Sequence, residues 1–155
     1  MRSVSATFHR FDRVSLWNVL QNTGVYVLWT EQGRRGPSYI GEGDLVNRLG
    51  SHSHSAKGPI DGVVALTEDK EEARLVEAAL LWCADEMGVR PRGQIKIGQK
   101  TLKDCCGECS LLKVHIRGQD PMRAPSSPVM TGTKTIEFEL DEDGELLFSM
   151  PWNRR

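Results

Sequence analysis

Five residues of types used in hydrolysis fall within one stretch of the sequence. Tyr26 closes the run Gly24-Val25-Tyr26, and Tyr39 opens the run Tyr39-Ile40-Gly41. Arg48 follows, with His52 four residues later, and Glu77 lies further along the chain. Phosphodiester hydrolysis needs an activated water, neutralisation of phosphate charge and stabilisation of the leaving oxygen. Phenol, guanidinium, imidazole and carboxylate groups can divide these tasks if the fold brings them together.

Glu77 is the carboxylate that asks for an explanation. At the 3.6-residue period of a helix, the residues within about 60° of it are apolar or small: Ala73, Leu80, Leu81 and Ala84. Burying a carboxylate among such side chains is costly unless a cation meets it. An arginine, a lysine or a metal ion would each satisfy that need.

The elements that must position these residues can be predicted from local pattern. Residues 24–30 are rich in β-branched and aromatic side chains and predict a strand, and 38–41 predict a second strand antiparallel to it across a polar turn. The apolar run 63–66 predicts a buried strand. Asp44 should begin a short helix that ends near Gly50.

A longer helix is predicted from the N-cap Thr67 to about Met87, with Gly88 as its C′ residue. Beyond it, residues 111–116 suggest a strand. Apolar and polar side chains alternate strictly over residues 135–140, and a second apolar segment, 146–148, follows the turn signal Asp143-Gly144. This pattern predicts a C-terminal β-hairpin. Leu16 to Leu20 suggest a short N-terminal element.

The expected fold class is therefore α+β, an α/β sandwich. A small central antiparallel sheet of about three strands is flanked by helices, and the C-terminal hairpin is an extension. A chain of 155 residues favours a single domain, 1–155, with a core at 22–94, an N-terminal extension at 1–21 and a C-terminal extension at 95–155.

Over roughly residues 22–94 the chain resembles the GIY-YIG nuclease family. The two tripeptide runs match the family's two half-motifs, Arg48 matches the arginine of the following helix, and His52 matches a His or Tyr often found four residues on. The segment 72–81 resembles the family helix that carries the metal-binding glutamate, here Glu77. Five positions in the right order are a more specific signal than either tripeptide alone.

The resemblance implies a divalent-metal-dependent endonuclease that acts on nucleic acid, most of all DNA. Glu77 would hold Mg²⁺ or Mn²⁺, and Arg48 would stabilise negative charge on the phosphate. We favour Tyr26 as the general base, with Tyr39 and His52 holding the phosphate or relaying the proton. A phenol has an ordinary pKa of about 10, so a nearby cation would have to lower the pKa of the base. Substrate binding is assigned to the remaining motif positions: Gly24, Gly41, Lys57 and Gln94.

The sequence also departs from the family pattern. Twelve residues separate the half-motifs, slightly more than is common in the family. Glu42 stands where many relatives have a lysine, and Gln94 stands near the position of a family asparagine. These departures favour a second hypothesis, a catalytically weakened domain that binds nucleic acid or a protein partner. A third is an unrelated α+β domain with chance tripeptides.

Each candidate residue also has a purely structural interpretation. The tyrosines could pack in the sheet, the glycines could serve tight turns, Arg48 could pair with Asp44, and His52 could be a solvated loop residue. Glu77 could pair with a core arginine. Cys105, Cys106 and Cys109 include a Cys-x-x-Cys step, but a zinc site usually needs four ligands, so ordinary reduced thiols are favoured.

Composition limits the function classes. A formal net charge of -1 excludes a strongly basic nucleic-acid coat but permits a local basic patch. No apolar run approaches the roughly 20 residues of a membrane span, so no membrane association is expected. The N-terminal residues show no apolar secretory region, which favours the cytoplasm. Oligomeric state is not predicted.

Overall fold

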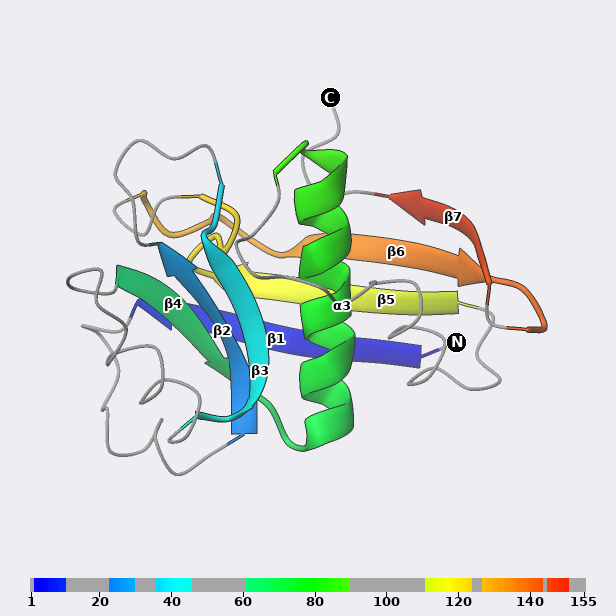
Figure 1. Ribbon diagram of the computed structural model, residues 1–155, viewed down its shortest axis with the longest axis horizontal. Helices are drawn as coiled ribbons and strands as arrows, with labels where there is room; N and C mark the ends of the chain where they lie inside the picture. The colour runs from blue at the N-terminus through cyan, green and yellow to red at the C-terminus, as the bar shows by residue number, and fades with distance from the viewer. Residues whose placement is uncertain are drawn as a thin grey trace.

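The main feature of the fold is one seven-stranded mixed sheet with a long helix across one face (Figure 1). The computed structural model describes residues 2–10, 23–29, 36–45, 61–89, 111–123, 127–143 and 145–150. The elements are β1 (Arg2–Arg10), β2 (Thr23–Trp29), β3 (Tyr39–Asp44), β4 (Asp61–Leu66), α3 (Lys70–Glu86), β5 (Leu111–Gly118), β6 (Lys134–Leu140) and β7 (Leu146–Met150). Across the sheet the strands run in the order β3-β2-β4-β1-β5-β6-β7.

This architecture corrects the predicted fold class. A three-stranded antiparallel sheet flanked by helices is wrong. The three expected strands are present as β2, β3 and β4, but they form only one end of a larger sheet, and α3 is the one helix formed in full in the described part of the chain. The physical reason lies in the C-terminal strands, which have an apolar face of their own. A hairpin with one apolar face is not stable alone, and joining the existing sheet buries that face against the same core.

β1 joins the two ends of the sheet, and its importance was missed in the sequence. Val4, Ala6 and Phe8 alternate with small polar residues and are buried in the core. β1 pairs in parallel with β5 from Arg2 to Phe8, and among the described residues it pairs antiparallel with β4 at His9 and Arg10. The sheet is therefore mixed, and the β2–β3 hairpin is steeply inclined to β1, β5 and β6 (Figure 1).

The main core lies between α3 and the sheet. Helix residues such as Val76 and Leu80 form one buried cluster with Val25 and Val27 of β2 and with Val114 of β5. At the C-terminal end of α3, Trp82 meets the ring of Phe138 edge-on at a centroid distance of 6.2 Å. The Trp82 indole nitrogen donates a hydrogen bond of 3.0 Å to the Ser149 hydroxyl, which ties α3 to β7. One helix thus contacts both ends of the sheet.

The predicted C-terminal end of α3 is confirmed, but its predicted N-cap is wrong. The N-cap is Asp69 rather than Thr67: the Asp69 carboxylate accepts a hydrogen bond of 2.8 Å from the Glu72 amide, as a capping side chain does. Thr67 instead donates from its hydroxyl to the Asp69 carbonyl. Gly88 follows the helix with a φ of +72°, a conformation that glycine adopts without strain, so the predicted stop is confirmed.

The predicted C-terminal strands are confirmed. β5, β6 and β7 pair in sequence order, and their inward residues, including Leu112, Ile136 and Phe138, are buried. In the turn between β6 and β7 the Asp141 carboxylate accepts hydrogen bonds from the amides of Asp143 and Glu145. The opposite face of β5 and β6 carries polar side chains, including Lys113, His115 and Glu137, as expected for a sheet covered on one side.

Candidate active site

Two tyrosines from neighbouring strands stack on one face of the sheet. In the antiparallel register of β2 and β3, Tyr26 lies opposite Gly41 and Leu28 lies opposite Tyr39. Tyr26 and Tyr39 are therefore diagonal neighbours on the same face, a position from which aromatic side chains reach one another. Their ring centroids are 6.0 Å apart with 13° between the planes. The adjacency of the two half-motifs, predicted from sequence, is confirmed.

Gly41 makes room for the Tyr26 ring. A Cβ atom on residue 41 would lie 2.3 Å from the Tyr26 hydroxyl and 2.4 Å from Cζ. The phenol of Tyr26 therefore lies directly across the backbone of β3. Gly24 is also closely packed, because a Cβ atom there would lie 2.3 Å from the Ala65 carbonyl oxygen. The geometry gives both glycines a packing role, and their predicted contact with substrate stays a prediction.

The two tyrosines differ in access to solvent. Tyr26 is 1% exposed and packs with Leu28, Leu45 and Val64, whereas Tyr39 is half-buried at the border of that cluster. A group that takes a proton from water has to reach that water or a chain of waters. Of the two phenols, Tyr39 is the better placed to meet a substrate, and Tyr26 is the better placed to hold the Tyr39 ring.

Glu77 is buried as the helical pattern predicts. It is 1% exposed, and Ala73, Leu80 and Ala84 on the same helix face belong to the main core. Glu77 makes at least one polar or electrostatic contact, so its charge is not isolated. The burial of Glu77 predicted from the helical pattern is thus confirmed.

The helix that carries Glu77 lies across the sheet from the tyrosine rings. Val25 and Val27, on either side of Tyr26 in β2, belong to the core cluster that contains α3. Successive side chains of a strand point to opposite faces, so the Tyr26 side chain points away from α3. Its membership in a separate cluster agrees with this. Among the described residues, the two tyrosines come together, while Glu77 lies on the helix that covers the other face of the sheet.

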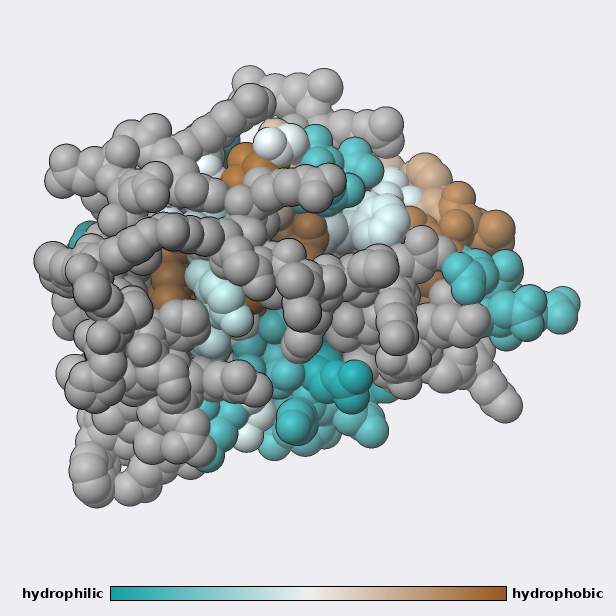
Figure 2. Space-filling view, in the orientation of Figure 1, coloured by the Kyte–Doolittle hydropathy of each residue, from teal (hydrophilic) through white to brown (hydrophobic). Residues whose placement is uncertain are grey.

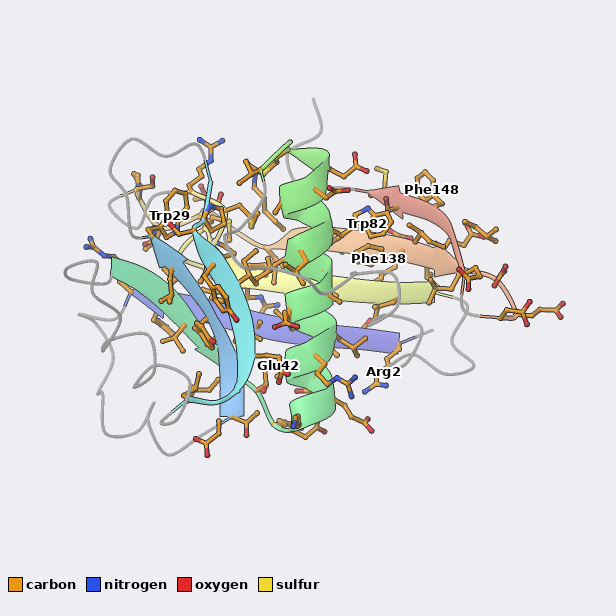
Figure 3. All side chains as sticks on the ribbon, viewed as in Figure 1. Arg2, Trp29, Glu42, Trp82, Phe138 and Phe148 are labelled. Carbon is orange, nitrogen blue, oxygen red and sulfur yellow. The ribbon has the colours of Figure 1, made fainter. Side chains whose placement is uncertain are left out.

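A second buried carboxylate, Glu42, lies on that edge strand. Glu42 is opposite Val25 in the register and so points toward α3, and it is 8% exposed (Figure 3). Like Glu77, it makes at least one polar or electrostatic contact. In the sequence, Glu42 stood out only as an acid in place of the lysine of many relatives. Its burial could have been found from the two-residue period, because Ile40 on the same strand is a core residue.

Four predicted site residues fall outside the described ranges: Arg48, His52, Lys57 and Gln94. The same holds for Cys105, Cys106 and Cys109. Within those ranges, no group of three or more His, Cys, Asp or Glu side chains is arranged to hold a metal ion.

No family model, curated protein or solved structure matches the chain. The resemblance to GIY-YIG nucleases therefore stays a prediction from the motif residues of the sequence. No helix in the described ranges is long and apolar enough to cross a bilayer.

Proposed function

We propose that the protein is a divalent-metal-dependent endonuclease that hydrolyses phosphodiester bonds in nucleic acid, most of all DNA. The observation that carries the proposal is the β2–β3 hairpin. It joins the two half-motifs in antiparallel register, with the Tyr26 phenol lying across Gly41 and stacked on Tyr39. A buried glutamate on the helix that packs beside β3 provides the acid that the chemistry requires.

The proposed site is centred on the outer edge of β3. Tyr39 approaches this edge from one face of the sheet, and Glu42 points to the other face, where α3 and Glu77 lie. In this arrangement Tyr39 contacts the phosphate or the attacking water, and Tyr26 fixes the Tyr39 ring. This assignment reverses the roles that the sequence suggested for the two tyrosines, because Tyr26 is almost fully buried.

Glu77 is the residue proposed to hold Mg²⁺ or Mn²⁺, with Glu42 as a neighbouring negative charge. A carboxylate oxygen is the donor that these hard cations prefer. When bound, the ion would polarise the phosphate and stabilise the leaving oxygen. Arg48, His52, Lys57 and Gln94 keep their proposed roles in charge stabilisation and substrate contact. The cytoplasm is the proposed location, where the buried thiol of Cys83 would stay reduced.

Cleavage by single-atom variants tests the proposal. Purified protein is incubated with Mn²⁺ or Mg²⁺ and with supercoiled, branched and single-stranded DNA, and nicking is measured. Glu77→Gln should abolish cleavage, whereas Glu86→Gln, an exposed acid on the same helix, should leave it unchanged. Tyr39→Phe should reduce the rate by about 10²–10⁴, the usual contribution of a positioned proton-transfer group. Full activity in Glu77→Gln or Tyr39→Phe would refute the proposed site.

A second candidate function is a nucleic-acid-binding module without catalysis. The burial of Tyr26 and the position of α3 on the other face of the sheet from the tyrosines favour it. Calorimetry with Mg²⁺ or Mn²⁺ separates the two candidates. The nuclease predicts metal binding that is lost in Glu77→Gln, whereas the module predicts DNA binding that is the same with and without metal.

A further inference from the structure

β1, β5 and β6 present one polar face of the sheet to solvent. Their inward side chains pack in the core under α3, and alternate residues point to the other face, the outer face. On β1 the outer face carries exposed hydroxyl groups and an imidazole: Ser3, Ser5, Thr7 and His9. On β5 it carries Lys113, His115 and Arg117, and on β6 it carries Thr135, Glu137 and Glu139. Hydroxyl groups and cations therefore lie side by side on this face.

The strand register divides the outer face into an end with paired charges and a basic end. At the first end Lys113 forms an ion pair of 3.9 Å with Glu137. At the second end Thr7 of β1 lies beside Arg117 of β5. The Arg117 Nε donates a hydrogen bond of 2.9 Å to the Thr133 hydroxyl, which orients the exposed guanidinium. A guanidinium has five N–H donors, so most of them stay available to a ligand.

The basic end of the outer face adjoins the tyrosine pair. His9, the last outward residue of β1, lies opposite Val64 of β4, and Val64 lies opposite Tyr26 of β2. Residues directly opposite one another share a face of the sheet. Val64 and Tyr26 also belong to the cluster against which Tyr39 packs. One face therefore leads from Arg117 past His9 to the two phenols, and β5 and β3 are four strand spacings apart, about 19 Å.

The other side of the molecule has acidic groups at the start of α3. Glu68, Asp69 and Glu71 are exposed there. Figure 2 shows the hydrophilic surface around the start of this helix, in the lower part of the view. Acids at a helix N-terminus suit the helix dipole, but they repel a polyanion. Charge therefore favours the outer face as the path of a phosphate chain.

We propose that the outer face binds the sugar-phosphate backbone of DNA and leads it to the tyrosine pair. The choice of DNA rests on the proposed function. Phosphate oxygens are contacted in protein–DNA complexes by arginine, lysine and hydroxyl side chains, which are the groups that Thr7 and Arg117 supply. At about 3.4 Å per nucleotide of one strand, the distance of about 19 Å spans five to six nucleotides. Such contacts position the DNA without selecting its sequence.

DNA binding in the absence of cleavage tests this surface. The full chain is titrated into a short fluorescein-labelled duplex in EDTA, and anisotropy gives the affinity between about 50 and about 200 mM salt. Arg117→Gln should weaken binding about eightfold at about 0.1 M salt and lower the slope of log affinity against log salt by about 0.9, the effect of one lost phosphate contact. The matched control is Lys134→Gln, because Lys134 is exposed but lies opposite Ile116, a core residue of the other face. Its slope should equal that of wild type.

Insertion of charge on β1 is a second test that keeps the hydrogen bond of Arg117. Thr7→Glu places a carboxylate beside Arg117 and should weaken binding at least as much as Arg117→Gln does. Ser3→Glu adds the same charge on the same face about 13 Å away, which is more than the Debye length of about 8–10 Å, so its effect should be much smaller. Circular dichroism verifies that each variant is folded.

Three results would overturn the proposed surface: no binding of DNA by wild type in EDTA, a slope in Arg117→Gln equal to that of wild type, or equal losses in Arg117→Gln and Lys134→Gln. Competition by polyglutamate as effective as competition by unlabelled DNA would indicate an acidic protein partner and would also overturn it. Nicking with Mg²⁺ is measured on the same samples. DNA that binds through Arg117 without being nicked would refute only the nuclease, whereas nicking with unchanged binding in Arg117→Gln would refute only this surface.

Discussion

The contact between Gly41 and Tyr26 leads to a quantitative prediction. In Gly41→Ala the new methyl group would lie 2.3 Å from the Tyr26 hydroxyl and 2.4 Å from Cζ, and the ring is enclosed on its other sides by a buried cluster. If the ring shifts but stays buried, overpacking should lower the free energy of unfolding by about 1–3 kcal/mol. The stiffer unfolded chain should raise it by about 0.4–1 kcal/mol. If the ring is expelled, the lost burial of roughly 200 Å² sets an upper limit of about 5 kcal/mol.

The free energy of unfolding is measured by urea titration followed by tryptophan fluorescence. A net loss of at least about 1 kcal/mol is expected for Gly41→Ala. The decisive measurement is a double-mutant cycle with Tyr26→Leu, because leucine lacks the three tyrosine side-chain atoms that the methyl group would meet: the hydroxyl oxygen, Cζ and Cε2. In the Tyr26→Leu background, Gly41→Ala should be neutral or slightly stabilising.

Gly24→Ala provides the control for this cycle. Its new methyl group would meet the Ala65 carbonyl oxygen, a backbone atom that Tyr26→Leu does not remove. Its cost should therefore be the same with Tyr26 or Leu at position 26. Costs of Gly41→Ala and Tyr26→Leu that add to within about 0.5 kcal/mol would show that the two residues do not interact, and the packing explanation of Gly41 would be wrong.

Two further predictions concern α3. Asp69→Ala should lower the free energy of unfolding by about 0.5–2 kcal/mol through loss of the N-cap, whereas Thr67→Ala should cost clearly less, and the reverse order would restore Thr67 as the cap. Ser149→Ala should lower the free energy of unfolding by about 1 kcal/mol, because it removes the acceptor of the Trp82 indole nitrogen, and Trp82→Phe should lower it further. Urea titration measures the stability of both variants. An unchanged midpoint in Ser149→Ala would show that this hydrogen bond contributes nothing.

Local patterns predicted the parts of the fold that depend on neighbouring residues. The strand alternation in β6 and the Asp143-Gly144 turn are readable from a dozen residues, and so is the stripe that buries Glu77. The order of the strands in the sheet cannot be predicted in this way, because no residue near β1 in the sequence indicates that β1 pairs with Leu111–Gly118. The N-cap was misplaced by two residues for a related reason: Thr67 and Asp69 are both good caps, and only the path of the chain after β4 decides between them.

The candidate site shows the same division. Spacing and residue type predicted that Tyr26 and Tyr39 would be neighbours, since both lie on strands of one hairpin. The depth of each ring was not predictable, because it depends on what covers the sheet rather than on the strand itself. The burial of Glu42 was missed because its charge was considered before its position in β3. Glu42 lies two residues after the core residue Ile40, and alternate residues of a strand share a face.

The bridging position of β1 has a consequence for how the molecule assembles. β1 has its longest pairing with β5, more than a hundred residues later in the chain. Pairings across such long separations are slow to form, because the intervening chain must first be closed into a loop. During translation β1 therefore cannot complete its pairing until β5 has been synthesised. Until then β2, β3, β4 and α3 can already pack together, because all four precede β5 in the chain.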